Sequence, residues 1–334
     1  LAPRDDVHRP DVQAFGHGGP YRGSRHKRSY DEPPSGVRRR RRDPAQFMPR
    51  PLVDRTSVGD TLRGVLELTR PANCVAAGVL TATGAFVAGV GDALVAAGLA
   101  VATTVVAVAA GNAVNDYFDR EIDAINRPDR PIPRGAVSPR GALAFSVALF
   151  VSAVGLAASL PPAALGLAAV NLVALLTYTT VFKGTPGLGN VLVSALVGST
   201  FLFGGAAVGR LDAPLVLAVL ATLSTLTREI IKDVEDVAGD REEGLTTLPI
   251  AIGSRRALWV GAASLGAAVV VSPLPYLLGT FGAAYLVVVA IADATMLYAW
   301  YESFGDPAAG RAHFKYGTFL ATIAFVVGRA ALLV

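Results

Sequence analysis

The residues best suited to chemistry lie in a charged segment that follows an apolar stretch at residues 93–110. Asn115, Asp119 and Asp123 are spaced at i, i+4 and i+8. On a continuous helix they share one face, because a step of four residues advances the helix by about 400°. Asp116 lies one position off that face. Because close carboxylates repel one another unless a cation neutralises them, the spacing favours a bound cation.

A second acidic group lies in "REIIKDVEDVAGDREEGLTTLP", where Asp236 and Asp240 are again four residues apart and Asp233 is one turn earlier. Oxygen ligands without His or Cys favour a hard ion, above all Mg²⁺. Mg²⁺ held by a few carboxylates usually completes its shell with water and substrate phosphates. The sequence therefore predicts an Mg²⁺ cofactor. The expected metal ligands are Asn115, Asp119, Asp123, Asp233, Asp236 and Asp240.

Basic residues near both acidic groups would supply the other half of a phosphate site, since Arg and Lys pair with phosphate oxygens. The alternative is that the acidic groups are ordinary helix-end charges in surface ion pairs. Two groups with the same spacing favour the metal and phosphate interpretation. The basic residues concerned are Arg70, Arg127, Arg130, Arg134, Lys183 and Lys232.

The rest of the chain has the composition of a polytopic membrane protein. Of its 334 residues 52% are hydrophobic and 17% are charged, whereas soluble domains carry about 25% charged residues. Each long apolar run is near the roughly 20 residues that a helix needs to cross a bilayer. We expect an all-α fold with nine membrane spans, at residues 72–91, 93–115, 140–159, 162–182, 188–208, 213–232, 255–273, 276–300 and 315–333.

Among the loops between the expected spans, those after spans two, four, six and eight carry nearly all of the basic residues, whereas the others hold one arginine among them, Arg210. By the positive-inside rule the charged loops and the N-terminus are cytoplasmic, and the C-terminus is outside. Both acidic groups then lie on the cytoplasmic side. We expect an integral protein of the cell membrane whose active site faces the cytoplasm.

The N-terminal segment, residues 1–60, differs from the rest in its Arg and Pro content, and we expect a disordered tail ahead of a membrane domain at 61–334. Its basic run, Arg38 to Arg42, would suit anionic lipid or nucleic acid. A solvated tail is the favoured interpretation, and no nucleic-acid partner is expected.

Taken together, these motifs resemble those of the UbiA superfamily of intramembrane prenyltransferases, from about Thr61 to the C-terminus. The family motif Asn-x-x-x-Asp-x-x-x-Asp matches Asn115 to Asp123, followed by an Arg-Pro-rich stretch, here "NRPDRPIPRG". Its Asp-x-x-x-Asp motif matches Asp236 and Asp240, followed by "EEGLTTLPI". Further matches are Arg70 and Pro71 in "LTRPANC", and Tyr178 and Lys183 in "TYTTVFKGTPGLGN".

The resemblance implies nine helices around a central cavity, two Mg²⁺ ions and an isoprenyl diphosphate donor, with membrane lipid around the bundle. Carried onto this chain, it gives Lys183, Arg134 and Tyr178 as catalytic residues. It gives Arg70, Asn115, Arg127, Arg130, Lys183, Asn190 and Lys232 as substrate-binding residues.

The acceptor is less clearly marked than the donor. The second motif is most similar to that of the archaeal branch, which transfers a geranylgeranyl group to geranylgeranylglyceryl phosphate, a glycerol-phosphate ether. Chlorophyll synthases compete, since the text around the first motif is similar, and a quinone precursor is a further alternative.

A cation-coupled transporter is a hypothesis of another class. It predicts ionisable groups near the middle of the membrane, and Asp293 in the eighth span is one such residue. The sequence shows no internal repeat, and a transporter does not need two matched acidic groups. The small residues in "VLTATGAFVAGVG" and "GSTFLFGGAAVG" are interpreted as sites of close helix packing.

Overall fold

The structure is a computed structural model that describes residues 57–182 and 185–333, all within the unit Arg55–Val334. Every regular element of the described residues is a helix, as expected from the sequence. The predicted tail lies outside the described residues up to position 56. The elements are α1 Val58–Thr69, α2 Pro71–Ala88, α3 Leu94–Phe118, α4 Arg120–Asn126, α5 Pro139–Ala157, α6 Pro162–Thr177, the π-helical η2 Tyr178–Phe182, α7 Leu188–Ala207, α8 Asp212–Glu242, α9 Leu248–Ile252, α10 Ser254–Val271, α11 Leu274–Leu277, α12 Ala284–Glu302 and α13 Pro307–Ala330.

Local sequence signals fix where several helices begin. The side chains of Ser57, Ser138 and Asp306 accept hydrogen bonds from backbone N–H groups in the first turns of α1, α5 and α13, at 3.2, 3.0 and 3.0 Å. Pro139 and Pro307 then occupy early positions where no helical N–H partner is needed. These starts place the connecting loops at the two ends of the bundle.

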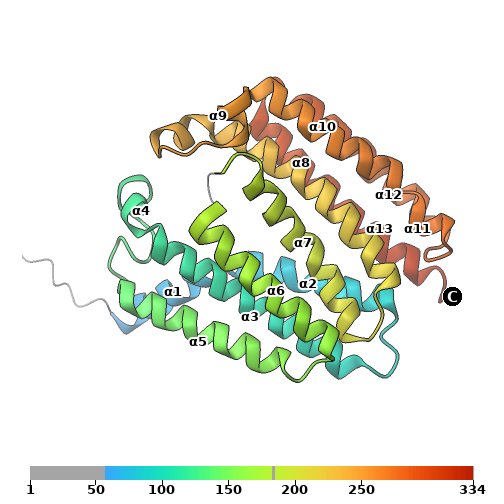
Figure 1. Cartoon of the computed structure of the whole chain (residues 1–334), viewed down its shortest axis with the longest axis horizontal. Coiled ribbons are helices and arrows are strands. Elements are labelled where there is room, and N and C mark those ends of the chain that lie inside the picture. Colours follow the sequence, from blue (N-terminus) through green and yellow to red (C-terminus); the bar gives the residue numbers. More distant parts are fainter. Residues whose placement is uncertain (1–56, 183–184, 334) are drawn as a thin grey trace, which may run out of the picture. The chain divides into compact units, whose positions relative to one another are not determined.

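Long helices lie side by side, and the short α4 and α9 lie at one end of the bundle (Figure 1). The C-terminus and the turn between α7 and α8 lie at the other end. Helix α3 runs into α4, and α8 reaches as far as Glu242 before α9 follows. Because α3 and α8 end on the same side, the fold brings both acidic motifs to one end, as the loop charges predict.

Within the described residues, seven helices are long and apolar enough to cross a membrane. The predicted count of nine is therefore not confirmed. The predicted spans at 162–182 and 315–333 do correspond to helices, but α6 has only 16 residues. Helix α13 has 24 residues, and its polar residues, including Lys315 and Arg329, lower its hydropathy.

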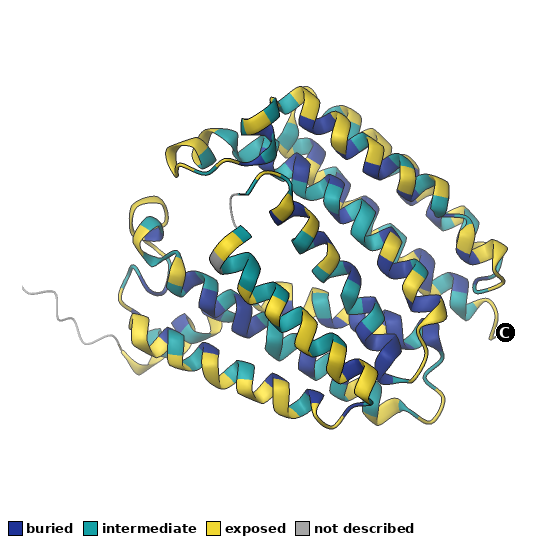
Figure 2. Cartoon of the chain, in the orientation of Figure 1, coloured by how far each residue is buried: buried dark blue, intermediate teal, exposed yellow. Residues whose placement is uncertain are grey.

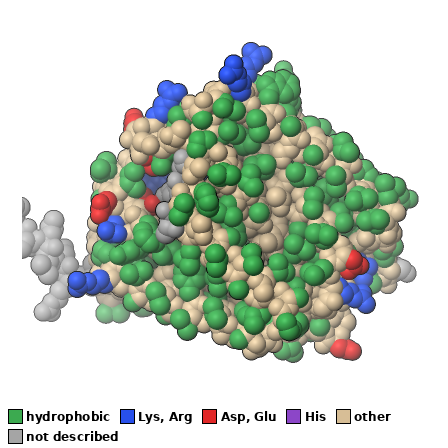
Figure 3. Space-filling view, in the orientation of Figure 1, with side chains coloured by type: hydrophobic (Ala, Val, Ile, Leu, Met, Phe, Trp, Pro, Cys, Tyr) green, Lys and Arg blue, Asp and Glu red, His purple; other side chains and the backbone are tan. Residues whose placement is uncertain are grey.

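The outer surface of the bundle suits a lipid environment. Outward positions alternate with buried ones along each long helix (Figure 2). Val151, Val170 and Val287 are 66%, 64% and 65% exposed, which would be costly in water and favourable in lipid. Charged side chains on the visible face gather toward its margins, and its middle carries hydrophobic side chains (Figure 3).

The largest buried side chains lie between α2, α7, α8, α12 and α13. Phe201, Leu217, Phe281 and Tyr285 are almost fully buried there, and Phe325 contacts three of the aromatic rings. This half of the bundle is a filled apolar core. It forms a rigid support for α7 and α8, which carry site residues at their ends.

Helices α2 and α7 cross at a distance that only glycine permits. A Cβ on Gly84 would lie 2.2 Å from the carbonyl oxygen of Phe201, and one on Gly204 would lie 2.0 Å from that of Thr81. Gly84 of α2 thus packs against the backbone of α7, and Gly204 of α7 packs against the backbone of α2. The interpretation of these small residues as a close-packing surface is confirmed.

We expect Gly204→Ala to lower stability by about 3 kcal/mol, because the added methyl must push two helix backbones apart. The matched control is Gly166→Ala in α6, where an added Cβ meets nothing within 4 Å. That change is expected to be neutral or to stabilise by about 0.5 kcal/mol through helix propensity. Thermal unfolding midpoints in detergent measure both, and equal midpoints for the two variants would contradict the close approach.

Candidate active site

The first acidic motif lies where α3 ends and α4 begins. The Asp119 N–H donates to the Asn115 carbonyl at 2.9 Å, and the Asp123 N–H donates to the Asp119 carbonyl at 2.8 Å. The backbone at Asp119 has φ −83° and ψ 0°, close to helical values. The three residues therefore stand on successive helical turns, as their spacing predicts, although the helix divides at Asp119.

Asp116 is the best-buried carboxylate of this region, and sequence reasoning gave it no role. Its Oδ1 accepts from Arg70 Nη2 at 2.5 Å and from Arg130 Nη1 at 3.0 Å. The same Arg130 nitrogen donates to Asp123 Oδ2 at 2.7 Å. One arginine therefore bridges two buried carboxylates. The spacing could not reveal this, because Arg70 and Arg130 come from other segments of the chain.

The Asp123 carboxyl belongs to a crowded acidic environment. Burial raises the pKa of Asp123, Arg130 lowers it in part, and the charges of Asp116 and Asp119 raise it further. The arginine therefore does not fully compensate for burial and repulsion. An added cation beside this group would favour its ionised form.

Arg70 combines an unusual backbone with a role at the site. It has φ 49° and ψ 70°, the left-handed region, and it is the one non-glycine residue with positive φ among those the structure describes. Such a conformation is costly for a residue with a Cβ. It ends α1 and turns the chain into α2 at Pro71. The residue that joins α1 and α2 thus also forms an ion pair with the Asp116 carboxylate.

The second motif lies within the last turns of α8. Asp233 is buried, and its Oδ2 accepts from Asn190 Nδ2 of α7 at 2.7 Å. Lys232 Nζ lies 3.9 Å from Asp233 Oδ1 and 3.6 Å from Asp236 Oδ2. Asp240 is one turn further along the helix. A single lysine therefore partly neutralises this group, as arginines do in the first.

Contacts on two sides hold this end of α8. Asn126, the last residue of α4, donates through Nδ2 to Glu243 Oε1 at 3.1 Å. Glu235, between the motif aspartates, forms an ion pair with Arg311 Nε of α13 at 2.8 Å. The Asn126 contact joins the segment after the first motif to the segment after the second. The two acidic groups therefore lie at the same end of the bundle (Figure 1).

The π-helical segment η2 lies between the motifs. Thr179 Oγ1 donates to Asn115 Oδ1 at 2.6 Å. The Tyr178 phenol is within electrostatic reach of Asp119 from the first motif and of Asp233 from the second. Single π-helical turns are frequent at functional sites. The structure therefore places η2 beside Asn115, with the Tyr178 phenol exposed to the charge of both motifs.

Two other predicted site residues are less well defined. Lys183 lies outside the described residues. Arg127 follows α4 and is exposed. It lies near the first motif because it is the residue that ends α4, and its substrate-binding role stays a prediction.

A polar cleft of about 490 Å³ opens beside the first motif. Arg134 is held at its wall by Glu67 at 2.6 Å and by the Asp129 carbonyl at 2.8 Å. Its buried Nη2 has no hydrogen-bond partner and lies 3.5 Å from Asp60. Four arginines and four carboxylates line the cleft, and most of them pair with one another. Its lining residues are Asp60, Arg63, Glu67, Arg70, Asp116, Asp129, Arg130, Pro131 and Arg134.

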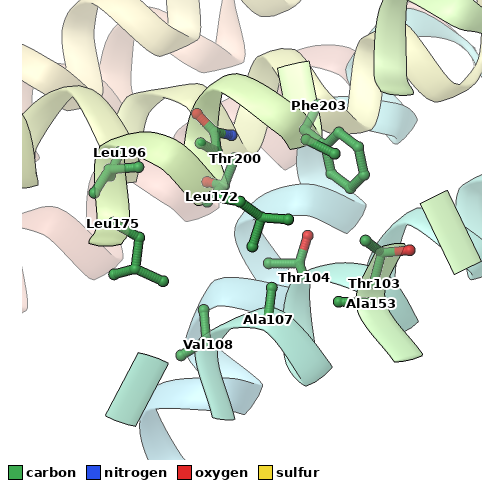
Figure 4. A pocket seen from close by; sticks show the side chains of 12 residues that line it. Thr103, Thr104, Ala107, Val108, Ala153, Leu172, Leu175, Leu196, Thr200 and Phe203 are labelled. Atoms are coloured by element: carbon green, nitrogen blue, oxygen red, sulfur yellow. The ribbon is translucent and has the colours of Figure 1, made fainter. Parts of the chain in front are cut away.

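An apolar cavity of about 130 Å³ lies deeper in the bundle, between α3, α5, α6 and α7 (Figure 4). Its wall on α3 includes Thr104 and Val108, which precede Asn115 by two to three turns. Leu172 and Leu175 of α6 and Phe203 of α7 point into it (Figure 4). The described fold thus has an apolar space along the same helix that ends in the acidic motif.

The donor set fits Mg²⁺ in chemistry. No three His, Cys, Asp or Glu side chains within the described part of the chain converge as a ready metal cage. Mg²⁺ does not need one, because it is usually held by one or two carboxylates together with waters and substrate phosphates. Each motif offers such oxygen ligands, with Asp123 and Asp236 now facing Arg130 and Lys232. The metal assignments remain predictions.

Comparison with known proteins agrees with this geometry. The UbiA prenyltransferase family matches residues 76–325, most of the chain and both acidic motifs. The chain belongs to the UbiA prenyltransferase family. The resemblance seen in the sequence is thus confirmed, and the chain is an enzyme of this family and an integral membrane protein.

Relatives within the UbiA family are similar over nearly their whole length. A digeranylgeranylglyceryl phosphate synthase of Natronomonas pharaonis is 59% identical over 273 residues, 81% of this chain and 99% of the relative. The Halobacterium salinarum protein of that name is also 59% identical, over 81% of this chain and 98% of its own.

Solved structures of UbiA proteins share the fold. A digeranylgeranylglyceryl phosphate synthase structure superposes with a TM-score of 0.72 at 33% identity, covering 81% of this chain and 99% of that chain. A UbiA homologue from Archaeoglobus fulgidus, bound to DMAPP and Mg²⁺, superposes with a TM-score of 0.64 at 20% identity, covering 81% and 99%. At that identity, the second likeness shows the fold alone.

Asp293, the mid-membrane candidate, lies away from the acidic motifs in the packing of α10 and α12. Its Oδ2 accepts from Ser272 Oγ at 2.6 Å, and the Ser272 carbonyl accepts from Tyr285 at 2.6 Å. The carboxylate therefore belongs to a buried hydrogen-bonded cluster near the end of α10. This arrangement suits helix packing better than an ion path.

We expect Arg130→Gln to destabilise the protein by about 3 kcal/mol, because it leaves two buried carboxylates without their shared cation. Adding Asp116→Asn to that variant should restore part of the loss by removing one of the charges. Thermal unfolding in detergent measures both.

The control for Arg130 is Arg63→Gln, which breaks the ion pair of an arginine whose side chain is 76% exposed. Surface pairs of this kind contribute at most about 1 kcal/mol. A loss for Arg130→Gln no larger than that of the control would show that the bridge is not a structural constraint.

Proposed function

We propose that this protein transfers a geranylgeranyl group from geranylgeranyl diphosphate to the free hydroxyl of geranylgeranylglyceryl phosphate. The allylic C1–O bond of the donor breaks, diphosphate leaves, and C1 forms an ether bond to the acceptor oxygen. The hydroxyl proton would pass to an oxygen of the departing diphosphate. The product is digeranylgeranylglyceryl phosphate, and the bond is the second ether bond of archaeal membrane lipid.

The observation that carries the proposal is that two acidic motifs lie at one end of the bundle, beside a cleft lined by arginines and carboxylates. The Asn126–Glu243 contact joins the segments that follow the motifs. A site with facing carboxylates and nearby cations suits a metal-bound diphosphate. The relatives at 59% identity, named digeranylgeranylglyceryl phosphate synthase, support the choice of acceptor.

The donor diphosphate would lie between the two motifs. Mg²⁺ bound there would offset the negative charge that develops on the leaving diphosphate, and UbiA homologue structures with DMAPP and with GPP also contain Mg²⁺. Asn115, Asp119, Asp123, Asp233, Asp236 and Asp240 supply the oxygen ligands in this proposal. Tyr178 would orient the diphosphate by donating a hydrogen bond from its phenol O–H.

The chain's own cations would complete the donor site. Lys232 lies between Asp233 and Asp236 and can turn toward phosphate once a metal neutralises those carboxylates. We assign Lys183, Arg127 and Arg130 to the same diphosphate from their places in the motif segments. Asn190 holds Asp233 at 2.7 Å and so orients a metal ligand.

The apolar cavity along α3 supports the handling of a prenyl group. An allylic cation is captured by water unless the site excludes it. The cavity is lined by side chains such as Leu172, Leu175 and Phe203. Its wall would shield the reacting carbon and receive the first isoprene units, while the rest of the chain extends toward lipid.

The polar cleft suits the phosphate of the acceptor. Arg70 and Arg134 line it, and they now pair with Asp116 and with Glu67 and Asp60, respectively. An acceptor phosphate would accept from these guanidinium groups in the charge-assisted manner that arginine favours. We therefore place the donor diphosphate and the acceptor phosphate in adjacent compartments of one mouth.

We further propose that the site opens to the cytoplasm of a cell membrane. The loops at the end with the acidic motifs carry most of the basic residues of the membrane domain, which is the bias of cytoplasmic loops. Both phosphate-bearing substrates are polar at one end and apolar at the other. An opening at the membrane surface would admit the polar phosphate ends, and the helix bundle would admit the apolar prenyl chains.

The test is to incubate the purified protein with geranylgeranyl diphosphate, Mg²⁺ and single acceptors, and to identify products by mass. We expect the ether product from geranylgeranylglyceryl phosphate, at least tenfold less from its dephosphorylated analogue, and none in EDTA until Mg²⁺ is restored. Arg134→Gln should raise the acceptor KM more than the donor KM.

Other outcomes would separate the alternatives. Preferred turnover of chlorophyllide or a quinone precursor would contradict the acceptor and leave the family assignment standing. Full activity in chelator would contradict the metal site. Cation-coupled uptake by proteoliposomes without product formation would favour the transporter hypothesis.

A further inference from the structure

Two arginines meet at the end of the bundle opposite the acidic motifs. Arg210 lies in the turn between α7 and α8, and Arg329 lies in the last turn of α13. Both reach Gly89, which follows the last residue of α2. Helix α2 has 18 residues and starts beside the active site at Pro71, so about 27 Å of helix separates the two ends. The arginine pair is thus remote from the reaction.

The two guanidinium groups lie close together. A Cβ on Gly89 would be 3.2 Å from Arg329 Nη2 and 3.5 Å from Arg210 Nη1, so these nitrogens are about 7 Å apart or less. One phosphate group can bridge such a gap with an N–H···O bond of about 2.8 Å on each side. Gly89 has φ 89° and no side chain, which leaves the space between the guanidinium groups open.

Neither guanidinium has a carboxylate partner among the described residues. The ion pairs within residues 57–182 and 185–333 include neither Arg210 nor Arg329, although Asp212 lies near Arg210 in the sequence. Arg210 Nη1 makes one long hydrogen bond, to the Ala88 carbonyl at 3.4 Å. Arg329 Nε is buried and has no hydrogen-bond partner. Because Arg329 Nε is buried, the terminal Nη groups of the two arginines are the donors available to an anion.

The surroundings of the pair are those of a lipid interface. Leu211, next to Arg210, is 42% exposed, and Leu332 and Leu333, which follow Arg329, are 48% and 67% exposed. A free phosphate ion gains nothing from such neighbours. A lipid places its phosphate on the arginines and its chains along the apolar surface.

We propose that Arg210 and Arg329 form a binding site for the phosphate of an anionic membrane lipid, at the membrane surface opposite the active site. The lipid supplies a counter-ion that none of the described residues provides there. It would join α2, the α7–α8 turn and α13, three segments far apart in the sequence. The inference does not depend on the acceptor assigned above.

The test is native mass spectrometry of the detergent-purified protein titrated with dioleoylphosphatidylglycerol, dioleoylphosphatidylcholine or sodium phosphate. We expect one phosphatidylglycerol to bind more tightly than either other probe. In the Arg210→Gln/Arg329→Gln variant the affinity of that lipid should fall about thirtyfold, the scale of one lost lipid contact from each of two arginines. Each single variant should lose about fivefold.

The control is Arg255→Gln/Arg256→Gln, which removes two exposed arginines from the start of α10 at the other end of the bundle. This control variant should keep the wild-type affinity for phosphatidylglycerol. The Arg210→Lys/Arg329→Lys variant should keep part of that affinity. Prenyl-transfer turnover of the Arg210→Gln/Arg329→Gln variant in detergent should stay within about twofold, which reports that it is folded. Equal lipid affinity in that variant and the wild type, or equal affinity for free phosphate and lipid, would overturn the proposal.

Discussion

Arg130 donates to Asp116 at 3.0 Å and to Asp123 at 2.7 Å, and this shared ion pair makes the rest of the site possible. Two buried carboxylates at the end of an apolar helix would otherwise repel one another and favour protonation. Arg70 adds a second cation to Asp116 and thereby fixes the hinge between α1 and α2. The arginines position the first motif before any metal or substrate binds.

The same constraint shapes the opposite side of the mouth. Lys232 lies between Asp233 and Asp236, and Asn190 satisfies the buried Asp233. In both motifs, cations of the chain occupy carboxylates that we assign to metal. Binding of Mg²⁺ and diphosphate would then be an exchange, in which metal replaces Arg or Lys on the carboxylates and the freed cations turn to phosphate. Such an exchange keeps charge balanced with and without substrate.

Much of this could be predicted from the sequence, because periodicity and charge bias report local structure directly. The apolar runs predicted an all-helical membrane bundle, and i, i+4 spacing predicted motif residues on successive turns. The count of nine spans was not confirmed, because α6 is short and α13 is polar at both ends. The role of Asp116 was missed because it depends on ion pairs with Arg70 and Arg130, and only the fold brings these arginines close to it. Likewise, the contact of Asn126 with Glu243 joins positions that no local pattern connects.

The central claim is that both motifs act on one diphosphate. A double-mutant cycle on kcat/KM for the donor, with Asp119→Asn and Asp236→Asn, tests it most directly. Groups that act as a unit are strongly non-additive. We predict that each single variant loses about 100-fold, on the scale of one lost stabilising group, and that the double variant loses at least tenfold less than the product of the two. Losses that multiply without coupling would show that the motifs serve separate sites.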